Sequence, residues 1–316
     1  MRIAVVGAGN WGKNLVRTFH GLGALAVVVE TSVQLREQVK AEYPDVIVSD
    51  GFKEAMACDA VALATPAQTH AEIAKMFLLL GKDVFVEKPM TLSSHEAEEL
   101  CAIAKDQDAI LMAGHLLLYQ PAIQWIREQI HGKLIGELVS VHQERLNLGK
   151  ARAVENVLWS LGVHDVAVAL YLLNSAPVKV RVSSQNVLTE GVADDYYVHI
   201  TSESGAQAHL HCSWLWPTRR RSTTLIGTQG MLVYDELAQT VTLHKKSIGD
   251  DLQNLDLGEE IVFEGAGEPL KIELQHFLDC CANRRQPFSN GESALEVIRV
   301  LEQAEQGTSD RIVAPC

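Results

Sequence analysis

A chain of 316 residues, 47% of them hydrophobic, is long enough for two domains that each bury a core. Its formal net charge of −13 and the lack of a basic stripe argue against binding to nucleic acid or to an anionic membrane surface. No apolar run approaches the roughly 20 residues of a membrane span. Six scattered cysteines without Cys-x-x-Cys spacing indicate neither a zinc site nor a disulfide framework. The amino terminus enters a strand without a signal-peptide pattern, so we expect a cytoplasmic protein.

A glycine-rich turn follows the first expected strand, which spans residues 2–6. An amphipathic helix with Leu15, Val16 and Phe19 on one face comes next. The spacing G-x-G-x-x-G between a strand and a helix is typical of a dinucleotide-binding turn, because the glycines let a pyrophosphate approach the backbone at the helix amino terminus. We therefore expect cofactor contacts at Gly7, Gly9, Asn10, Trp11 and Gly12.

A second strand is expected from Ala24 to Val29, and Glu30 follows it. This is about the position of the acid that binds the ribose in dinucleotide-binding folds. A carboxylate there accepts hydrogen bonds from both ribose hydroxyls and repels a 2′-phosphate. Glu30 therefore predicts NAD rather than NADP as the cofactor, although a surface glutamate at a strand end is the alternative.

Two later strands also end in polar residues. The strand 60–64 leads into Thr65 and Pro66, and His70 begins the next helix, so we expect these three residues on the nicotinamide-ribose side of the cofactor. For His70 the alternative is a helix-start residue without a ligand.

The stretch 84–89, Val-Phe-Val-Glu-Lys-Pro, predicts a buried central strand that ends in a lysine. Ligands of open α/β sheets bind outside the carboxyl ends of the strands, so we expect Glu87 at the cofactor and Lys88 at the reaction centre. A charged residue that merely closes a strand is the alternative. Strand and helix alternate six times, which predicts a doubly wound parallel sheet, a Rossmann domain, over residues 1–118.

The pattern changes after residue 119. Alternating strands with short glycine-containing turns predict an α+β domain with a mostly antiparallel open sheet over residues 119–316. Two helices are expected near its end, and the acidic stretch 248–260 is expected to be a disordered loop. Because one face of such a sheet stays uncovered, we expect a homo-oligomer, a dimer or tetramer, formed sheet to sheet.

A long helix is expected from about 156 to 173. Ser160 and His164 are four residues apart, so they share a helical face. The unperturbed pKa of an imidazole lies near physiological pH, and a neutral ring could take a proton from a substrate hydroxyl. A core histidine is the more common alternative. His209 and His211 share a strand face, but no third ligand is evident, so we expect no metal.

Three of these features together resemble the Gfo/Idh/MocA oxidoreductases over essentially the whole chain: the glycine-rich turn, Glu87-Lys88-Pro89 and His164. The resemblance implies a Rossmann domain, an α/β domain with an open sheet, bound NAD or NADP, and hydride transfer at a sugar or cyclitol carbon. It also implies a lysine near the nicotinamide, here Lys88, and an Asp-x-x-x-His pair in which Ser160 replaces the aspartate. We therefore expect Lys88 and His164, the catalytic pair, to face each other across the nicotinamide ring.

A narrower likeness lies in the segments 145–149, 152–159, 214–217 and 227–231, which are similar to the nucleotide-sugar 3-dehydrogenases of this family. It implies UDP-N-acetylglucosamine, or its uronic acid, as the substrate. A diphosphate needs cationic donors, which Arg145, Arg152 or the cluster 219–221 could supply, unless these arginines pair with surface acids. The other expected substrate contacts are Asn156, Trp159, Ser160 and Asp165. Another sugar or inositol dehydrogenase, or a non-catalytic NAD-binding sensor, remains an alternative.

Overall fold

The computed structural model describes residues 1–249 and 251–307, and these divide into two compact units. The first unit holds Met1–Tyr119 and Glu268–Arg299, and the second holds Gln120–Gly267 and the chain from Val300. The boundary expected from the sequence lies within one residue of the end of the first segment. The sequence-based boundary places residues 268–299 in the second domain, whereas the structure places them in the first unit.

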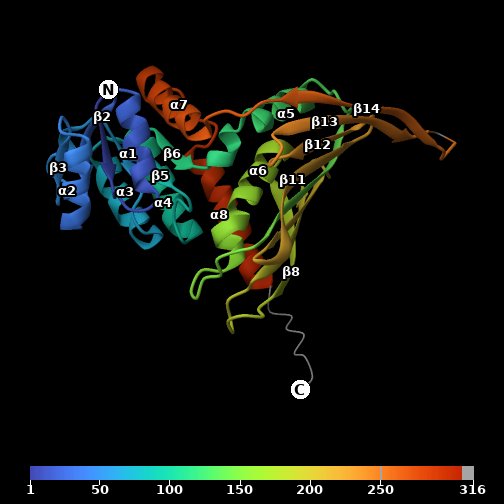
Figure 1. The fold of residues 1–316 in the computed structure, drawn as a ribbon, viewed down its shortest axis with the longest axis horizontal. Helices are drawn as coiled ribbons and strands as arrows, with labels where there is room; N and C mark the ends of the chain where they lie inside the picture. The colour runs from blue at the N-terminus through green and yellow to red at the C-terminus, as the bar shows by residue number, and fades with distance from the viewer. Residues whose placement is uncertain (250, 308–316) are drawn as a thin grey trace. The chain divides into compact units, whose positions relative to one another are not determined.

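The first unit is built on a six-stranded parallel sheet with the order β3-β2-β1-β4-β5-β6. All residues of β1, β4, β5 and β6 are buried, because helices cover both faces of the sheet. The predicted doubly wound sheet is thus confirmed (Figure 1). Its strands are β1 Ile3–Val6, β2 Leu25–Val29, β3 Ile47–Ser49, β4 Ala60–Leu63, β5 Asp83–Glu87 and β6 Leu111–Gly114. Its helices are α1 Gly12–Gly21, α2 Val33–Glu42, η1 Ala55–Ala57, η2 Ala67–Thr69, α3 His70–Leu79, α4 Ser94–Asp106 and η3 Leu116–Tyr119.

Two helices close the chain as expected, α7 Pro269–Asn283 and α8 Gly291–Gln306. Helix α7 belongs to the first unit because it packs on the parallel sheet. The rings of Phe277 and Phe85 lie edge to face with centroids 5.8 Å apart, and Arg284 pairs with Asp83 at 2.7 Å. A pairing between residues about 200 positions apart leaves no local pattern in the sequence.

The second unit is built on an eight-stranded sheet with the order β14-β13-β12-β11-β7-β10-β9-β8. Only the β7–β10 pair is parallel, so the predicted mostly antiparallel sheet is confirmed. Helices α5 and α6 lie on one of its faces (Figure 1). The strands are β7 Leu138–Leu148, β8 Pro177–Gln185, β9 Asp195–Ser202, β10 Gln207–Ser213, β11 Leu215–Gly227, β12 Met231–Asp235, β13 Thr240–Ile248 and β14 Asn254–Glu264. The helical segments are α5 Pro121–His131, η4 Leu158–Gly162 and α6 Val163–Leu173.

The disordered loop expected at residues 248–260 is wrong where the structure describes it. Strands β13 and β14 form an antiparallel hairpin there. The acids that suggested disorder face basic residues on β13: Lys245 pairs with Glu260 at 2.7 Å and Lys246 with Asp256 at 3.6 Å. The acidic composition of the stretch predicts disorder because it does not show that these acids pair with lysines on the neighbouring strand.

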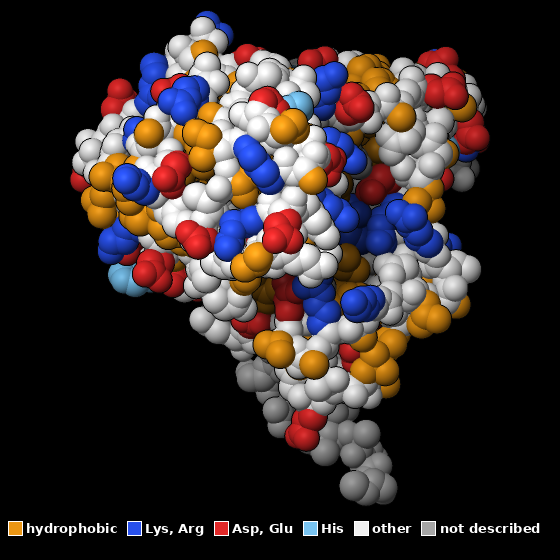
Figure 2. Space-filling model, turned by 60° about the vertical axis from the view of Figure 1, so that its left-hand side comes forward, with side chains coloured by type: hydrophobic (Ala, Val, Ile, Leu, Met, Phe, Trp, Pro, Cys, Tyr) orange, Lys and Arg blue, Asp and Glu red, His pale blue; other side chains and the backbone are white. Residues whose placement is uncertain are grey.

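Charges of both signs are mixed on one face of the protein. On the face shown in Figure 2, Lys and Arg side chains stand among Asp and Glu side chains. Across residues 1–249 and 251–307, no helix is long and apolar enough to cross a membrane.

Candidate functional site

The turn between β1 and α1 has the shape that a dinucleotide requires. Gly7 has φ +91°, and a Cβ on Gly12 would lie 2.0 Å from the Gly7 carbonyl oxygen, so both positions need glycine. A Cβ on Gly9 would meet nothing within 4 Å, so the turn is open at this residue. Trp11, the N-cap of α1, makes no side-chain cap. The turn therefore leaves backbone room and helix-start N–H groups for a pyrophosphate.

Glu30 stands directly after β2 and faces the same turn. One carboxylate oxygen accepts the Ala8 N–H at 2.7 Å, and the other accepts the Ser32 N–H at 2.9 Å. The Arg36 guanidinium donates to the carbonyls of Glu30 and Thr31, both at 2.8 Å, and so is engaged by the backbone. A carboxylate thus occupies the position where the sequence predicts the ribose-binding acid.

The ring of His70, a predicted cofactor contact, is bonded within the fold. The ring is buried, with Nδ1 2.9 Å from the Pro89 carbonyl oxygen and Nε2 2.9 Å from that of Thr65. Burial lowers the pKa of His70, although both backbone carbonyls oppose the shift. Both ring nitrogens are engaged, so His70 ties the end of β4 to the turn after β5 and has no nitrogen left for a ligand. Thr65 and Pro66 remain at the end of β4.

The end of β5 is connected to the glycine-rich turn through Glu87. The Trp11 indole Nε1–H donates to Glu87 Oε1, and the Lys88 N–H donates to Oε2 at 3.2 Å. Burial raises the pKa of Glu87 to about 7, against the effect of these donors. A Cβ at Gly114, the residue paired with Glu87 on β6, would lie 3.0 Å from Oε2. Glu87 therefore holds the Trp11 indole and the backbone N–H of Lys88 in place.

In the second unit, two predicted substrate contacts bind each other. Arg145 Nε donates to Asp165 Oδ1 at 2.7 Å, and Arg145 Nη2 donates to Glu236 Oε2 at 2.9 Å. Arg145 and Asp165 are both buried, and burial raises the pKa of Asp165 against the pull of Arg145. Arg145 thus forms ion pairs with two acids, which is the alternative to the predicted phosphate contact, because its donors already bind two carboxylates.

The predicted helix around His164 begins irregularly. A π-helical turn, η4, precedes α6, and His164 is the second residue of α6. Asn156 lies just before this turn: its Oδ1 accepts the Trp159 N–H at 3.1 Å, and its Nδ2 donates to Glu305 at 2.8 Å. Ser160 is buried, and its hydroxyl donates to the Val157 carbonyl at 3.4 Å. Asn156 and Ser160 therefore shape the turn that presents His164, which is half-buried.

The remaining predicted phosphate donors differ in accessibility. Arg152 is exposed and pairs with Glu155. Arg219 and Arg220 are exposed as well, and Arg220 pairs with Glu144 at 3.3 Å. Arg221 is half-buried and donates to Asn147 Oδ1 at 3.0 Å. Arg152, Arg219 and Arg220 are thus the exposed candidates.

The described residues contain no group of His, Cys, Asp and Glu side chains that could hold a metal ion. His209 Nδ1 lies 2.8 Å from His199 Nδ1, and His211 Nε2 lies 3.1 Å from Asp195. The two histidines thus interact with side chains of β9.

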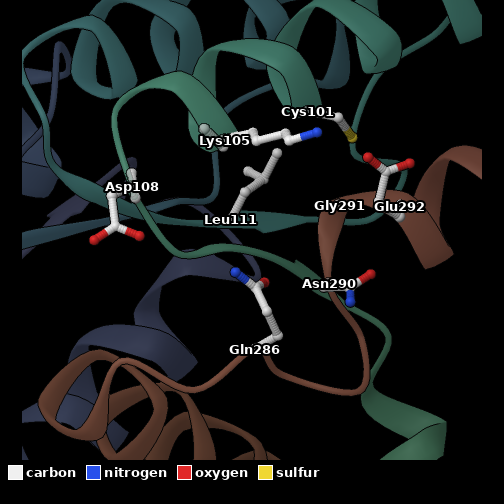
Figure 3. A pocket seen from close by; sticks show the side chains of 10 residues that line it. Cys101, Lys105, Asp108, Leu111, Gln286, Asn290, Gly291 and Glu292 are labelled. Carbon is white, nitrogen blue, oxygen red and sulfur yellow. The ribbon is translucent and has the colours of Figure 1, made fainter.

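A hollow of about 270 Å³ lies beside β6, an edge strand of the parallel sheet (Figure 3). It adjoins the carboxyl end of α4 and the start of β6, away from the strand ends that carry Glu30 and Lys88. Lys105 extends across it toward Cys101 and Glu292. Burial raises the pKa of the Cys101 thiol to about 12, so this cysteine is no nucleophile at neutral pH.

Two buried titratable side chains of the first unit carry no sequence signal. Glu273 on α7 and His115 after β6 are buried, and neither has a hydrogen-bond partner for its side-chain polar atoms among the described residues. Burial, and to a lesser degree the charge of Lys88, lower the pKa of His115 to about 4. An isolated glutamate in an amphipathic helix does not reveal that it faces a sheet.

Comparison with known proteins agrees with this architecture. Residues 1–115 match the model of an oxidoreductase family with an NAD-binding Rossmann fold, and residues 123–233 match the GFO/IDH/MocA C-terminal domain. UDP-N-acetylglucosamine 3-dehydrogenase of Acidithiobacillus ferrooxidans is 27% identical over 96% of each chain. A solved structure of that enzyme, GnnA, gives a TM-score of 0.89 with 26% identity, covering 98% of this chain and 97% of that one.

A second relative has a different substrate in its name. The scyllo-inositol 2-dehydrogenase (NAD(+)) of Bacillus subtilis is 27% identical and covers 91% of this chain and 88% of its own. Both relatives are dehydrogenases, and both family domains are present in sequence order. The chain therefore belongs to the Gfo/Idh/MocA family and is a nicotinamide-dependent oxidoreductase that acts on a CH–OH group.

Proposed function

We propose that this protein is an NAD-dependent dehydrogenase that oxidises the 3-hydroxyl of a UDP-N-acetylhexosamine to a 3-keto nucleotide sugar. The observation that carries the proposal is the similarity to UDP-N-acetylglucosamine 3-dehydrogenase over 96% of both chains. The glycine-rich turn and Lys88 supply the sites that such a reaction needs.

The choice of NAD rests on Glu30. A 2′-phosphate next to this carboxylate would meet its negative charge, and Arg36, the nearby cation, is engaged by two backbone carbonyls. The turn at Gly9 and the start of α1 would hold the pyrophosphate. Bound NAD supplies the hydride acceptor. The observed positions of Gly7, Gly12 and Glu30 fit that cofactor.

Lys88 and His164 are the residues to which we assign the proton chemistry. The ammonium of Lys88 lowers the pKa of the substrate hydroxyl and stabilises negative charge that develops on its oxygen. The imidazole of His164 accepts the proton from that oxygen. Since Ser160 stands where the family has an aspartate, no carboxylate at that position shares this task.

The diphosphate of the substrate needs accessible cations. Arg152, Arg219 and Arg220 are exposed, whereas Arg145 is held by Asp165 and Glu236. We therefore assign the phosphate contacts to Arg152, Arg219 and Arg220. Arg145 keeps Asp165 in place beside His164, and Trp159 remains a candidate contact for the sugar.

We infer further that the protein is a homo-oligomer that pairs through the uncovered face of its eight-stranded sheet. Tyr197 on β9 is 43% exposed, whereas its neighbours Tyr196 and Val198 are buried on the other face. Sedimentation analysis checks this, and a monomer at micromolar concentration would contradict it. A cytoplasmic location is supported by the five described cysteines, which are buried and form no disulfide.

The test is the formation of NADH with a panel of substrates. The panel holds UDP-N-acetylglucosamine, its uronic acid, free N-acetylglucosamine and scyllo-inositol. We expect turnover with a UDP-sugar, and mass spectrometry should find a product two hydrogens lighter. Turnover with scyllo-inositol alone would favour the cyclitol activity that the Bacillus relative suggests. No turnover with any member, despite NAD binding, would favour a sensor.

A further inference from the structure

Two buried carboxyl groups lie in one layer of the first unit. Glu87 is two residues after Phe85 on β5, so both side chains point to the same face of the sheet. Glu273 is four residues before Phe277 on α7, so these two share a helix face. The contact between Phe85 and Phe277, with ring centroids 5.8 Å apart, brings these two faces together. Glu273 therefore faces the sheet on the side to which Glu87 points.

The two carboxyl groups differ in their hydrogen bonds. Glu87 accepts from the Trp11 indole and from the Lys88 N–H. Glu273 is fully buried, and neither of its oxygens has a partner among the residues that the structure describes. A buried carboxylate without donors costs several kcal/mol, and such a group takes up a proton instead. A second negative charge next to Glu87 would raise that cost further.

We propose that Glu273 is a positioning residue that holds a proton at neutral pH. Because Glu273 is then neutral, the negative charge of this buried pair lies on Glu87, where it orients the Trp11 indole and the Lys88 backbone. A neutral Glu273 removes the repulsion that would otherwise drive a proton onto Glu87. The effect on cofactor binding at the glycine-rich turn rests on the proposed function, whereas the protonation of Glu273 does not.

The titration of the surrounding groups agrees with this geometry. Burial raises the pKa of Glu273 well above its usual value, and the charge of Glu87 raises it further. Burial also raises the pKa of Glu87, to about 7, while Trp11 and Lys88 oppose that shift. The other titratable side chains of α7 are Lys271, His276, Asp279, Cys280 and Cys281, and β5 also carries Asp83. Burial lowers the pKa of His276 and that of His115, which follows β6. The cation that faces Glu87 is Lys88.

The sign of the stability effect follows from these directions. A carboxyl with a folded-state pKa above its unfolded value gives a stabilising contribution that is complete below the unfolded value of about 4.5. The contribution is lost as the pH rises through the folded value. Glu273→Gln removes this group, so the melting temperature of the variant minus that of the wild type should become more positive from about pH 5 to about pH 8.5.

The direct measurement is infrared spectroscopy of the complete protein without substrate. The carbonyl stretch of a protonated carboxyl group should be present at neutral pH, and Glu273→Gln should reduce its intensity to the part that Glu87, whose pKa is about 7, contributes. Asp83→Asn is the matched control: Asp83 is also buried on β5, but Arg284 pairs with it at 2.7 Å and the Ile110 N–H donates to it at 2.7 Å. This control should leave the band unchanged and should lower the melting temperature at about pH 8.5.

Two results would overturn the proposal: no protonated-carboxyl band in the wild type at neutral pH, or a band of unchanged intensity in Glu273→Gln. Glu87→Gln gives a second check if Glu273→Gln does not fold. The band should persist in Glu87→Gln because burial is the main cause of the protonation, and its loss would also overturn the proposal. Glu87→Gln should weaken NAD binding by roughly 10-fold, as expected for a lost charged acceptor, while Glu273→Gln should keep it. Failure of the whole substrate panel would leave the band unaffected and so would count only against the proposed function.

Discussion

The two units hold their predicted site residues by different means. In the first unit, Glu30 and Glu87 stand directly at strand ends and accept hydrogen bonds from the glycine-rich turn or from the next residue. In the second unit, Arg145 meets partners 20 and 91 residues away in the chain. Backbone geometry places the first group, whereas side-chain pairing decides what the second can do. Local patterns therefore indicate function more reliably in the first unit.

The largest effect is expected for one residue of each unit. Lys88→Ala and His164→Ala should each reduce kcat by roughly 10²–10⁴-fold, because each removes a group that acts on the substrate proton. NADH formation at saturating UDP-sugar measures this, with circular dichroism to check the fold. Lys53→Ala and His131→Ala, both exposed, serve as controls. Unchanged turnover in either active-site variant would remove that residue from the mechanism.

Arg145→Met tests whether side-chain pairing in the second unit gives Arg145 a structural role. If Arg145 is structural, the loss of a buried cation leaves Asp165 and Glu236 uncompensated and should lower the free energy of unfolding by about 3–5 kcal/mol. Denaturant unfolding measures the change. Lys75→Met, which breaks the exposed pair with Glu99, should cost at most about 1 kcal/mol. A stable Arg145→Met protein with a higher KM for UDP-sugar would instead restore Arg145 to the phosphate site.

These pairings show where sequence-based prediction stops. The alternation of strand and helix, the glycine spacing and the lysine at the end of β5 are local patterns, and the parallel sheet is confirmed in full. The placement of α7 on that sheet depends on Phe277 meeting Phe85, which lies 192 residues earlier. Glu273, which α7 carries into the layer of Glu87, could not be singled out for the same reason.

The candidate residues divide in a similar way. Glu30 was identified from its distance to the glycine-rich turn, and the structure places its carboxylate on that turn. Position along the chain also predicts a cofactor contact at His70, and the likeness to nucleotide-sugar 3-dehydrogenases implies a substrate contact at Asn156, but the polar atoms of both are used within the fold. Position along an element predicts where a side chain starts, whereas its partners come from the tertiary packing.

A moderate effect is expected from Glu30→Gln. The amide retains one acceptor but loses the charge, so the Kd for NAD should rise by roughly 10-fold, as expected for a hydrogen bond to a charged group. The Kd for NADP should fall or stay constant because the repulsion of a 2′-phosphate is removed. Isothermal titration calorimetry with both dinucleotides measures the ratio. An unchanged preference for NAD would show that another residue reads the ribose.

The smallest effect is expected from Arg152→Ala. Arg152 is exposed and pairs with Glu155, so its contact with a diphosphate competes with that pair and with water. The KM for a UDP-sugar should rise only several-fold, with kcat unchanged, as for uniform binding. Lys150→Ala in the same segment serves as the control. A fall in kcat without a change in KM would contradict a role in substrate binding.

The central claim, oxidation at carbon 3 of the sugar, is tested most directly by isotope transfer. UDP-N-acetylglucosamine with deuterium on carbon 3 is incubated with the protein and NAD, and the reduced coenzyme is analysed by mass spectrometry. We predict that the reduced nicotinamide carries the deuterium and that the sugar product has lost it. Reduced coenzyme without deuterium, together with a sugar that retains it at carbon 3, would contradict the account.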